Sequence, residues 1–244
     1  AGNNAGLGQI IIDQLCTPLT ITVSDYTICL GETVTIEATS ETDATITWLD
    51  GFDNGIPFIP DGAGFHTYLG VSSDGSDCGA AATITVFPDP TIVANVDEDF
   101  ICEGDEITLH GTGGATYSWS PAFVIDDEPF TPPLGVSTYI VTGTTGVGCV
   151  NTDTITIEVF ESPTVTGLAD DYAICYGETV TFSGAGALSY EWSPGAIENG
   201  VPYSPPTAGE TIYTVIGTNG VGCQASDEVT VTMNAEIVLS YTVI

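Results

Sequence analysis

The sequence predicts an all-β chain, a tandem array of three immunoglobulin-like β-sandwich domains, on three observations. The phrase "ICYGETVTF" at 174–182 has near-copies "ICLGETVTI" at 28–36 and "ICEGDEITL" at 101–109, each 73 residues from the next. The apolar residues are mainly Val, Ile and Tyr interleaved with Thr, a composition typical of sheets. No segment shows the 3.6-residue periodicity of an amphipathic helix. Repetition at a fixed step indicates an array of similar units.

Four markers recur in the same order in each unit. The first cysteines are Cys29, Cys102 and Cys175, the tryptophans are Trp48, Trp119 and Trp192, the tyrosines are Tyr68, Tyr139 and Tyr213, and the second cysteines are Cys78, Cys149 and Cys223. We therefore predict repeats at 18–88, 89–161 and 162–234, an N-terminal strand segment at 1–17, and a C-terminal strand without a domain of its own at 235–244.

The middle repeat shows the elements expected in each unit. Its expected strands are "TIVANV" at 91–96, "EITLH" at 106–110, "ATYSWS" at 115–120, "STYIVTGTT" at 137–145 and "TDTITIEVF" at 152–160. Between the third and fourth lies "PAFVIDDEPFTPPLG", whose prolines and acids indicate a loop with at most one short strand. The last two strands are joined through "GVGC". Short strands separated by turns are typical of a β-sandwich.

The tryptophan on the third strand of each repeat has two interpretations. A core tryptophan packs between the two sheets, whereas an exposed one serves as a platform on which sugars stack. Alternation of Trp119 with Tyr117, and of Trp192 with Tyr190, favours the core. The exposed alternative predicts a polysaccharide-binding module of a larger secreted protein.

The charged residues of the chain are acidic. The chain has 33 acids, no Lys or Arg, and a formal net charge of −33. Nucleic acids and anionic lipid surfaces are therefore repelled, and trypsin-type proteases find no cleavage site. No run of 18 apolar residues exists, so membrane insertion is not expected. An extracellular protein exposed to proteases or salt fits this composition.

The cysteines predict disulfides and so an oxidising compartment. One pair per repeat suggests Cys29–Cys78, Cys102–Cys149 and Cys175–Cys223, each closing a loop of about 50 residues and stabilising the fold by roughly 2–4 kcal/mol. These cysteines flank strand ends, whereas the bridge of antibody domains joins the middles of strands, so pairing between neighbouring repeats stays open. Zinc is disfavoured because CxxC pairs are absent and no histidine lies nearby in sequence.

An acidic step precedes each first cysteine and offers hard oxygen ligands of the kind that Ca²⁺ prefers. Its candidate ligands are Asp25, Asp97, Asp99, Asp170 and Asp171. The alternative is a solvated acidic corner with diffuse counterions; no EF-hand loop is present. His66 and His110 do not recur at equivalent positions, and no nucleophile–base constellation is found. We expect no enzyme activity and no cofactor other than Ca²⁺.

The phrases "ICYGETVTF", "YEWSP", "SPPTAGETIYTVIG", "GVGC" and "EVTVTM" resemble the Ig-like or PKD-like repeats of very large secreted proteins of the Bacteroidota, including gliding-associated adhesins. The resemblance covers Pro18 to Met233. The first repeat departs most, with "ITWLD" and "SSDGSDCG" in place of "YSWSP" and "GTTGVGC". The resemblance implies an extracellular fibrous or adhesive protein of the cell surface and transfers no catalytic residue.

The repeat register leaves one apolar strand at each end, "IIIDQL" at 10–15 and "IVLSYTVI" at 237–244. Either the sequence is part of a longer array, or its ends pair with neighbouring copies by strand addition; the second interpretation is favoured. The contact residues would be Ile10, Ile12, Ile237, Leu239, Tyr241 and Cys16, the last as an intersubunit disulfide or a free buried thiol. The expected function is a non-catalytic stalk or filament subunit.

Overall fold

The computed structural model describes residues 16–73, 77–98 and 100–236. Its contacts group the chain into two compact units, one of residues up to 93 with 111–118 and 141–153, the other of 94–110, 119–140 and residues from 154 onward. The predicted domain boundaries stay a prediction. In the parts of the chain that the structure describes, no helix has the length and apolarity needed to cross a membrane.

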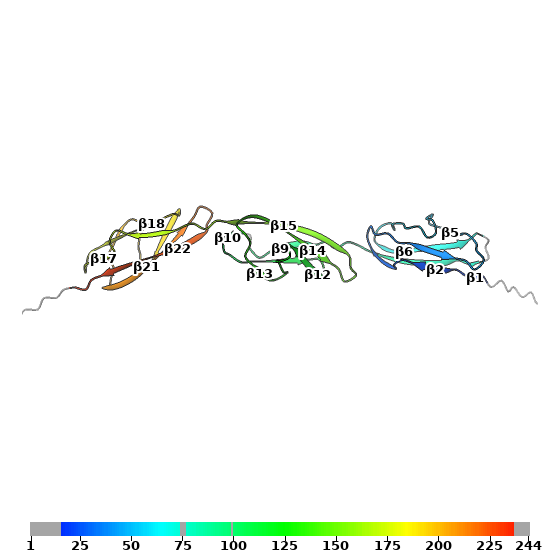
Figure 1. Ribbon diagram of the computed structural model, residues 1–244, viewed down its shortest axis with the longest axis horizontal. Coiled ribbons are helices and arrows are strands. Elements are labelled where there is room, and N and C mark those ends of the chain that lie inside the picture. The colour runs from blue at the N-terminus through cyan, green and yellow to red at the C-terminus, as the bar shows by residue number, and fades with distance from the viewer. Residues whose placement is uncertain (1–15, 74–76, 99, 237–244) are drawn as a thin grey trace, which may run out of the picture. The chain divides into compact units, whose positions relative to one another are not determined.

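The first repeat forms two facing sheets (β2, β5 and β6 in Figure 1). Its strands are β2 (Thr20–Val23), β3 (Thr27–Cys29), β4 (Ile36–Thr39), β5 (Ile46–Trp48), β6 (Gly64–Ser72) and β8 (Ala80–Phe87). The sheet orders are β3-β8-β6-β5 and β2-β4, with β3 parallel to β8. Two further short strands, β1 (Thr17–Pro18) and β7 (Asp77–Cys78), pair in parallel.

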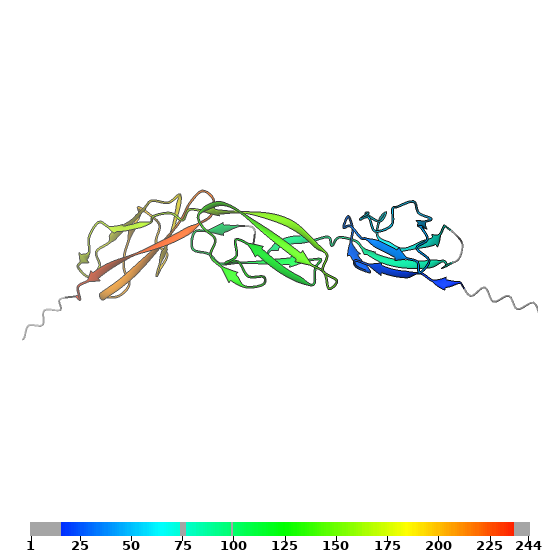
Figure 2. The same cartoon turned by 45° about the vertical axis from the view of Figure 1, so that its right-hand side comes forward.

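The third repeat has a similar arrangement of strands. Its strands are β16 (Thr166–Ala169), β17 (Ala173–Ile174), β18 (Val180–Ala185), β19 (Ser189–Ser193), β20 (Pro202–Tyr203), β21 (Gly209–Thr218) and β22 (Gln224–Met233). The sheet orders are β17-β22-β21-β19 and β16-β18-β20, with β17 parallel to β22. Figure 2 shows the long strands β21 and β22, in orange and red, side by side.

The strands of the middle repeat have the same order. They are β9 (Val93–Val96), β10 (Ile101–Cys102), β11 (Ile107–Thr112), β12 (Thr116–Ser120), β13 (Pro129–Phe130), β14 (Gly135–Thr144) and β15 (Val150–Phe160). The sheets are β10-β15-β14-β12 and β13-β11-β9, with β10 parallel to β15. The predicted all-β fold of tandem immunoglobulin-like sandwiches is confirmed.

The three tryptophans lie in the cores. Trp48, Trp119 and Trp192 are only 2%, 6% and 6% exposed. In the third repeat Phe182 packs against Trp192 and Tyr213, with ring centroids 5.0 and 4.5 Å away. The core interpretation is therefore confirmed, and these tryptophans form no exposed platform for sugars. Among the described residues no charged side chain is buried, as a chain without Lys or Arg to pair its acids requires.

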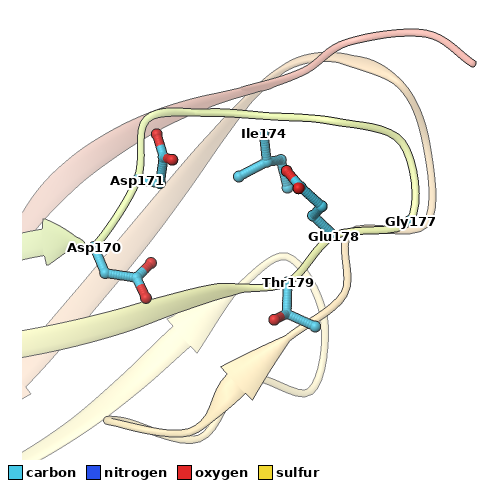
Figure 3. A pocket seen from close by; sticks show the side chains of 6 residues that line it. All are labelled: Asp170, Asp171, Ile174, Gly177, Glu178 and Thr179. Atoms are coloured by element: carbon cyan, nitrogen blue, oxygen red, sulfur yellow. The ribbon is translucent and has the colours of Figure 1, made fainter.

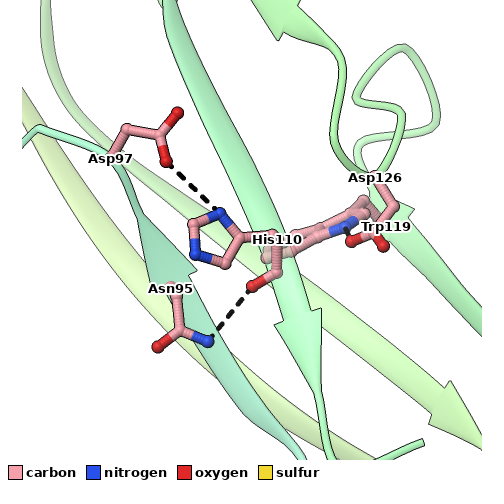
Figure 4. A network of polar contacts seen from close by, with 5 residues as sticks. All are labelled: Asn95, Asp97, His110, Trp119 and Asp126. Carbon is pink, nitrogen blue, oxygen red and sulfur yellow. Dashed lines mark hydrogen bonds and ion pairs between the residues drawn. The ribbon is translucent and has the colours of Figure 1, made fainter.

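Each buried indole N–H finds an acceptor on the loop that follows its strand, as buried tryptophans require. The acceptors for Trp48, Trp119 and Trp192 are Asn54, Asp126 and Asn199, at 3.0, 2.8 and 3.1 Å. Figure 4 shows the Trp119–Asp126 bond. Asp126 belongs to the proline- and acid-rich loop "PAFVIDDEPFTPPLG". Its carboxylate ties that loop to the core.

Replacing Asp126 with Ala should lower the free energy of unfolding by about 1–3 kcal/mol, because the Trp119 N–H then stays buried without a partner. Urea denaturation followed by tryptophan fluorescence measures this. Glu128→Ala, on the same loop and exposed, is the matched control and should change stability by less than about 0.5 kcal/mol. Equal effects of the two substitutions would show that the bond contributes nothing.

Candidate linkage site at the cysteine turns

Each first cysteine is the first residue of a four-residue turn, and two hydrogen bonds join the first and last residues of that turn. In the first repeat the Glu32 amide donates to the Cys29 carbonyl (3.1 Å), and the Glu32 carboxylate accepts from the Cys29 amide (2.8 Å). Gly31 between them has φ +84°, which a type II turn requires and glycine adopts without strain. The same two bonds join Asp105 to Cys102 (3.0 and 2.9 Å) and Glu178 to Cys175 (3.1 and 2.8 Å). The repeated Cys-x-Gly-acid phrase is therefore a structural turn that presents a cysteine.

The second cysteine of the middle and third repeats ends a different turn, between the two long strands. The Thr145 amide donates to the Cys149 carbonyl (2.8 Å), and the Cys149 amide donates to Thr145 Oγ1 (3.0 Å). Asn219 holds Cys223 in the same way, at 2.9 and 3.0 Å. Cys149 and Cys223 are buried, at 1% and 0% exposure.

The disulfides join the two kinds of turn across repeats. Cys29 is bonded to Cys149 and Cys102 to Cys223, with Cα–Cα distances of 5.5 and 5.6 Å. Cys175 is free and exposed. The predicted pairs Cys29–Cys78, Cys102–Cys149 and Cys175–Cys223 are wrong, and pairing between neighbouring repeats, left open by the sequence, is what the structure shows.

The strand pairing explains why a bridge within the middle repeat is impossible. Cys102 lies opposite Phe160, the last residue of β15. Cys149 immediately precedes Val150, the first residue of β15. A strand of this length spans about 33 Å at roughly 3.3 Å per residue, whereas bridged Cα atoms lie within about 7 Å. The two cysteines of one repeat therefore lie at opposite ends of its last strand.

The remaining cysteine predictions also need correction. Cys16 is already disulfide-bonded, so both the intersubunit bond and the free buried thiol are wrong. Cys78 lies in β7, and its side chain is outside the described part of the structure. The residues Ile10, Ile12, Ile237, Leu239 and Tyr241 also lie outside the described residues.

Further contacts surround the Cys102–Cys223 bond. The side-chain amide of Asn219 donates to the Glu161 carbonyl (2.8 Å), and Cys223 Sγ lies 3.9 Å from the Phe160 carbonyl oxygen. Phe160 in turn stacks on Phe100, with ring centroids 5.7 Å apart. The cysteine-bearing turn is thus held by the end of β15 as well as by the sulfur–sulfur bond.

The acids proposed as calcium ligands bind their own backbone. Asp25 accepts from the Thr27 amide (3.0 Å), Asp171 from the Ala173 amide (3.0 Å) and Asp170 from the Thr181 amide (2.7 Å). Asp97 lies 3.5 Å from Nδ1 of His110 (Figure 4), and Asp99 lies outside the described residues. Asp170 and Asp171 line one pocket together with Gly177 and Glu178 of the Cys175 turn (Figure 3). Among the residues described, no three metal-ligating side chains gather into a group.

The two histidines make contacts of an ordinary structural kind. His66 Nε2 lies 3.0 Å from the Gly62 carbonyl oxygen, and His110 pairs with Asp97. Through these contacts neither histidine activates a hydroxyl or a thiol.

Two carboxylates make the fold sensitive to acid. The Thr181 amide and hydroxyl lower the pKa of Asp170 below its ordinary value of 3.8, and the Gly167 amide, 2.9 Å from Asp227, lowers the pKa of Asp227 likewise. Because these pKa values are lower in the folded state, the stabilisation is present above pH 3.8 and is lost as pH falls through the folded pKa.

Asp227→Asn keeps an acceptor for the Gly167 amide but does not titrate. Melting temperatures from pH 6 to pH 2 should therefore show the wild type losing stability relative to this variant once pH drops below about 4. Glu228→Gln removes one charge at the adjacent exposed position and is the control for charge alone. A wild-type-to-variant difference that tracks the control at every pH would refute the role of Asp227.

No known protein-family model matches the chain, and no curated protein sequence matches it. Solved structures that are similar include titin domains I67–I69, at 12% identity and a TM-score of 0.35 over 91% of this chain and 99% of that one. A Ca²⁺-stabilised adhesin that helps an Antarctic bacterium to bind ice has 17% identity and a TM-score of 0.36 over 91% and 75%. A 1.5-MDa bacterial ice-binding adhesin has 16% identity and a TM-score of 0.32 over 91% and 100%. Likenesses this distant carry no inference about function.

Proposed function

We propose that this chain is a non-catalytic, extracellular structural protein, a stalk of immunoglobulin-like repeats that carries tension along a cell-surface fibre or adhesin. The observation that carries the proposal is the crossed disulfide pairing. The first cysteine of each of the first two repeats is bonded to the second cysteine of the following repeat. Each bond thereby ties two repeats together covalently.

The pairing suits a protein under tension because the two bridges overlap in sequence. The first spans 120 residues from Cys29 and the second 121 residues from Cys102, so the second begins before the first ends. Force applied at the two ends must pass through both bridges or through one whole repeat. Unfolding of a single repeat then lengthens the chain far less than it does in an unbridged array.

The composition of the chain supports the proposed extracellular location. Disulfides persist in oxidising compartments outside the cytosol, and a chain without Lys or Arg withstands trypsin-type proteases. The resemblance to Bacteroidota surface repeats agrees with this location. The partners are neighbouring repeats of a longer chain or copies of itself. Strand addition through residues 10–15 and 237–244 stays part of the proposal.

Immunogold labelling of intact source cells, with antibodies raised against this chain, tests the location. We expect gold on the outer surface, and we expect trypsin to leave the epitopes of this chain intact while a protease specific for Glu removes them. Label confined to permeabilised cells would contradict an extracellular role.

Salt should stabilise the fold. Thirty-three acids without basic partners repel one another, and at physiological ionic strength screening shortens the range of that repulsion to about 8 Å. We expect the melting temperature to rise between 10 mM and 150 mM NaCl; an unchanged value would contradict the prediction. Calcium at matched ionic strength tests the proposed Ca²⁺ binding, which requires a larger rise than NaCl produces.

A further inference from the structure

We infer that the Cys175 turn is an open half-site for the cysteine-bearing hairpin turn of another repeat, with which it forms a disulfide. The occupant has the chemistry of the second-cysteine turn, Asn or Thr followed three residues later by Gly-Cys. This inference rests on the proposed function and adds to it the cysteine through which a further repeat is linked.

The Cys175 turn is formed in full although its thiol is free. Glu178 makes both turn bonds at the same lengths as Glu32 does in the first repeat, and Gly177 has φ +86° against +84° at Gly31. In Figure 3 the Glu178 side chain points across the turn toward Ile174. The half-site is therefore organised before any partner arrives.

The two equivalent turns of the same chain show what such a half-site binds. Cys29 and Cys102 are both bonded, and in each case the partner is a buried cysteine that ends a hairpin turn. Both are half-buried, whereas Cys175 is exposed. Cys175 thus differs from its two counterparts in lacking a partner turn rather than in its own geometry.

The end of the last strand of the third repeat is also in place. At the bonded junction the Glu161 carbonyl accepts from the side-chain amide of Asn219 in the partner turn. In the strand register the counterpart of the preceding residue, Phe160, is Asn234 of the third repeat. Its backbone and side-chain amides donate to the Ile174 carbonyl at 2.8 and 3.2 Å, which holds the end of β22 against the strand that leads into Cys175.

The occupant comes from outside the turns already described. Cys149 and Cys223 are bonded to Cys29 and Cys102, so both hairpin turns of this kind are used. A further repeat of a longer polypeptide and a repeat of a separate protein share the required chemistry. Purifying source material with N-ethylmaleimide present, then comparing its size on gels with and without reductant, distinguishes them, because only an intermolecular bond releases a second protein.

The linkage forms by thiol–disulfide exchange. The Cys175 thiolate attacks a partner cysteine that is held as a mixed disulfide with a small thiol. The new bond forms between Cys175 and the partner sulfur, and the small thiol leaves as thiolate with the electron pair of the broken bond. No separate oxidant is consumed in this step.

The test uses the whole chain and a cyclised peptide of residues 212–228, in which Cys223 is activated as its 2-thiopyridyl disulfide. Attack by Cys175 releases thiopyridone, whose absorbance gives the rate. We expect the native hairpin to react about tenfold faster than a cyclised peptide of the same composition in scrambled order, because docking adds proximity to intrinsic thiol reactivity. Cys175→Ser should abolish the signal.

The variants Glu178→Ala and Glu178→Gln distinguish docking of the hairpin peptide from the intrinsic reactivity of the Cys175 thiol. The Ala variant loses the acceptor for the Cys175 amide, so the native-to-scrambled ratio should fall towards one, while the Gln variant should retain most of it. A ratio of one in the wild type would overturn the inference and leave Cys175 an ordinary exposed thiol. Faster bonding of Cys175 to Cys175 of a second copy would also overturn it. Neither result affects the bonds of Cys29 and Cys102, on which the proposed function stands.

Discussion

Stretched from its two ends, the oxidised chain should reach between Cys29 and Cys223 only about a quarter of the length that the reduced chain reaches. These two residues are 194 positions apart. With both bridges intact, the shortest covalent path runs from Cys29 to Cys149, back along 47 residues to Cys102, and across to Cys223. At about 3.5 Å per extended residue, the limits are roughly 160 Å for the oxidised and 680 Å for the reduced chain.

Single-molecule force extension measures these lengths directly. The decisive variant is Cys29→Ala with Cys149→Ala, which removes one crossed bridge and lengthens the path to the 73 residues between Cys29 and Cys102. Were the pairs formed within repeats, the same variant would lose two bridges and extend through the 146 residues between Cys29 and Cys175. A released length matching 146 residues would rule out the crossed pairing.

Removing the second bridge should destabilise the fold strongly. A loop of 121 residues corresponds to about 4–5 kcal/mol in the chain-entropy model of disulfide stabilisation. We expect Cys102→Ala with Cys223→Ala to lose about 4 kcal/mol in urea denaturation, and reduction of both bridges to cost less than twice that, because the loops overlap and share residues. Cys175→Ser is the matched control, since its thiol is free. A loss below about 1 kcal/mol would show that the bridge constrains the unfolded chain little.

Most of the fold could be predicted because its strands and repeats follow from patterns within short stretches of the sequence. Alternation within strands such as "EITLH" and the 73-residue step predicted the sandwiches, and the position of Trp119 beside Tyr117 predicted its burial. The disulfide pairing could not be predicted in the same way. It depends on the parallel pairing of β10 with the end of β15, a contact between segments 58 residues apart that leaves no periodic signal.

The roles of the acids were also missed, although one signal was available. An acid follows each first cysteine at the third position, as Glu32, Asp105 and Glu178, and that fixed spacing indicates a local bond rather than a solvated charge. Asp126 offered no such signal. The other two repeats use Asn54 and Asn199 for the same indole contact. The three repeats therefore share a side-chain oxygen acceptor at this place, and not a charged group.

Peptide mapping under non-reducing conditions tests the crossed pairing most directly. Digestion must use proteases that cut at acidic or apolar residues, because the chain has no Lys or Arg, and free thiols are blocked first with N-ethylmaleimide. We predict one linked peptide pair containing Cys29 and Cys149, another containing Cys102 and Cys223, and a bond from Cys175, where one forms, only to a cysteine other than Cys223. Linked peptides that join Cys102 to Cys149 would contradict the account.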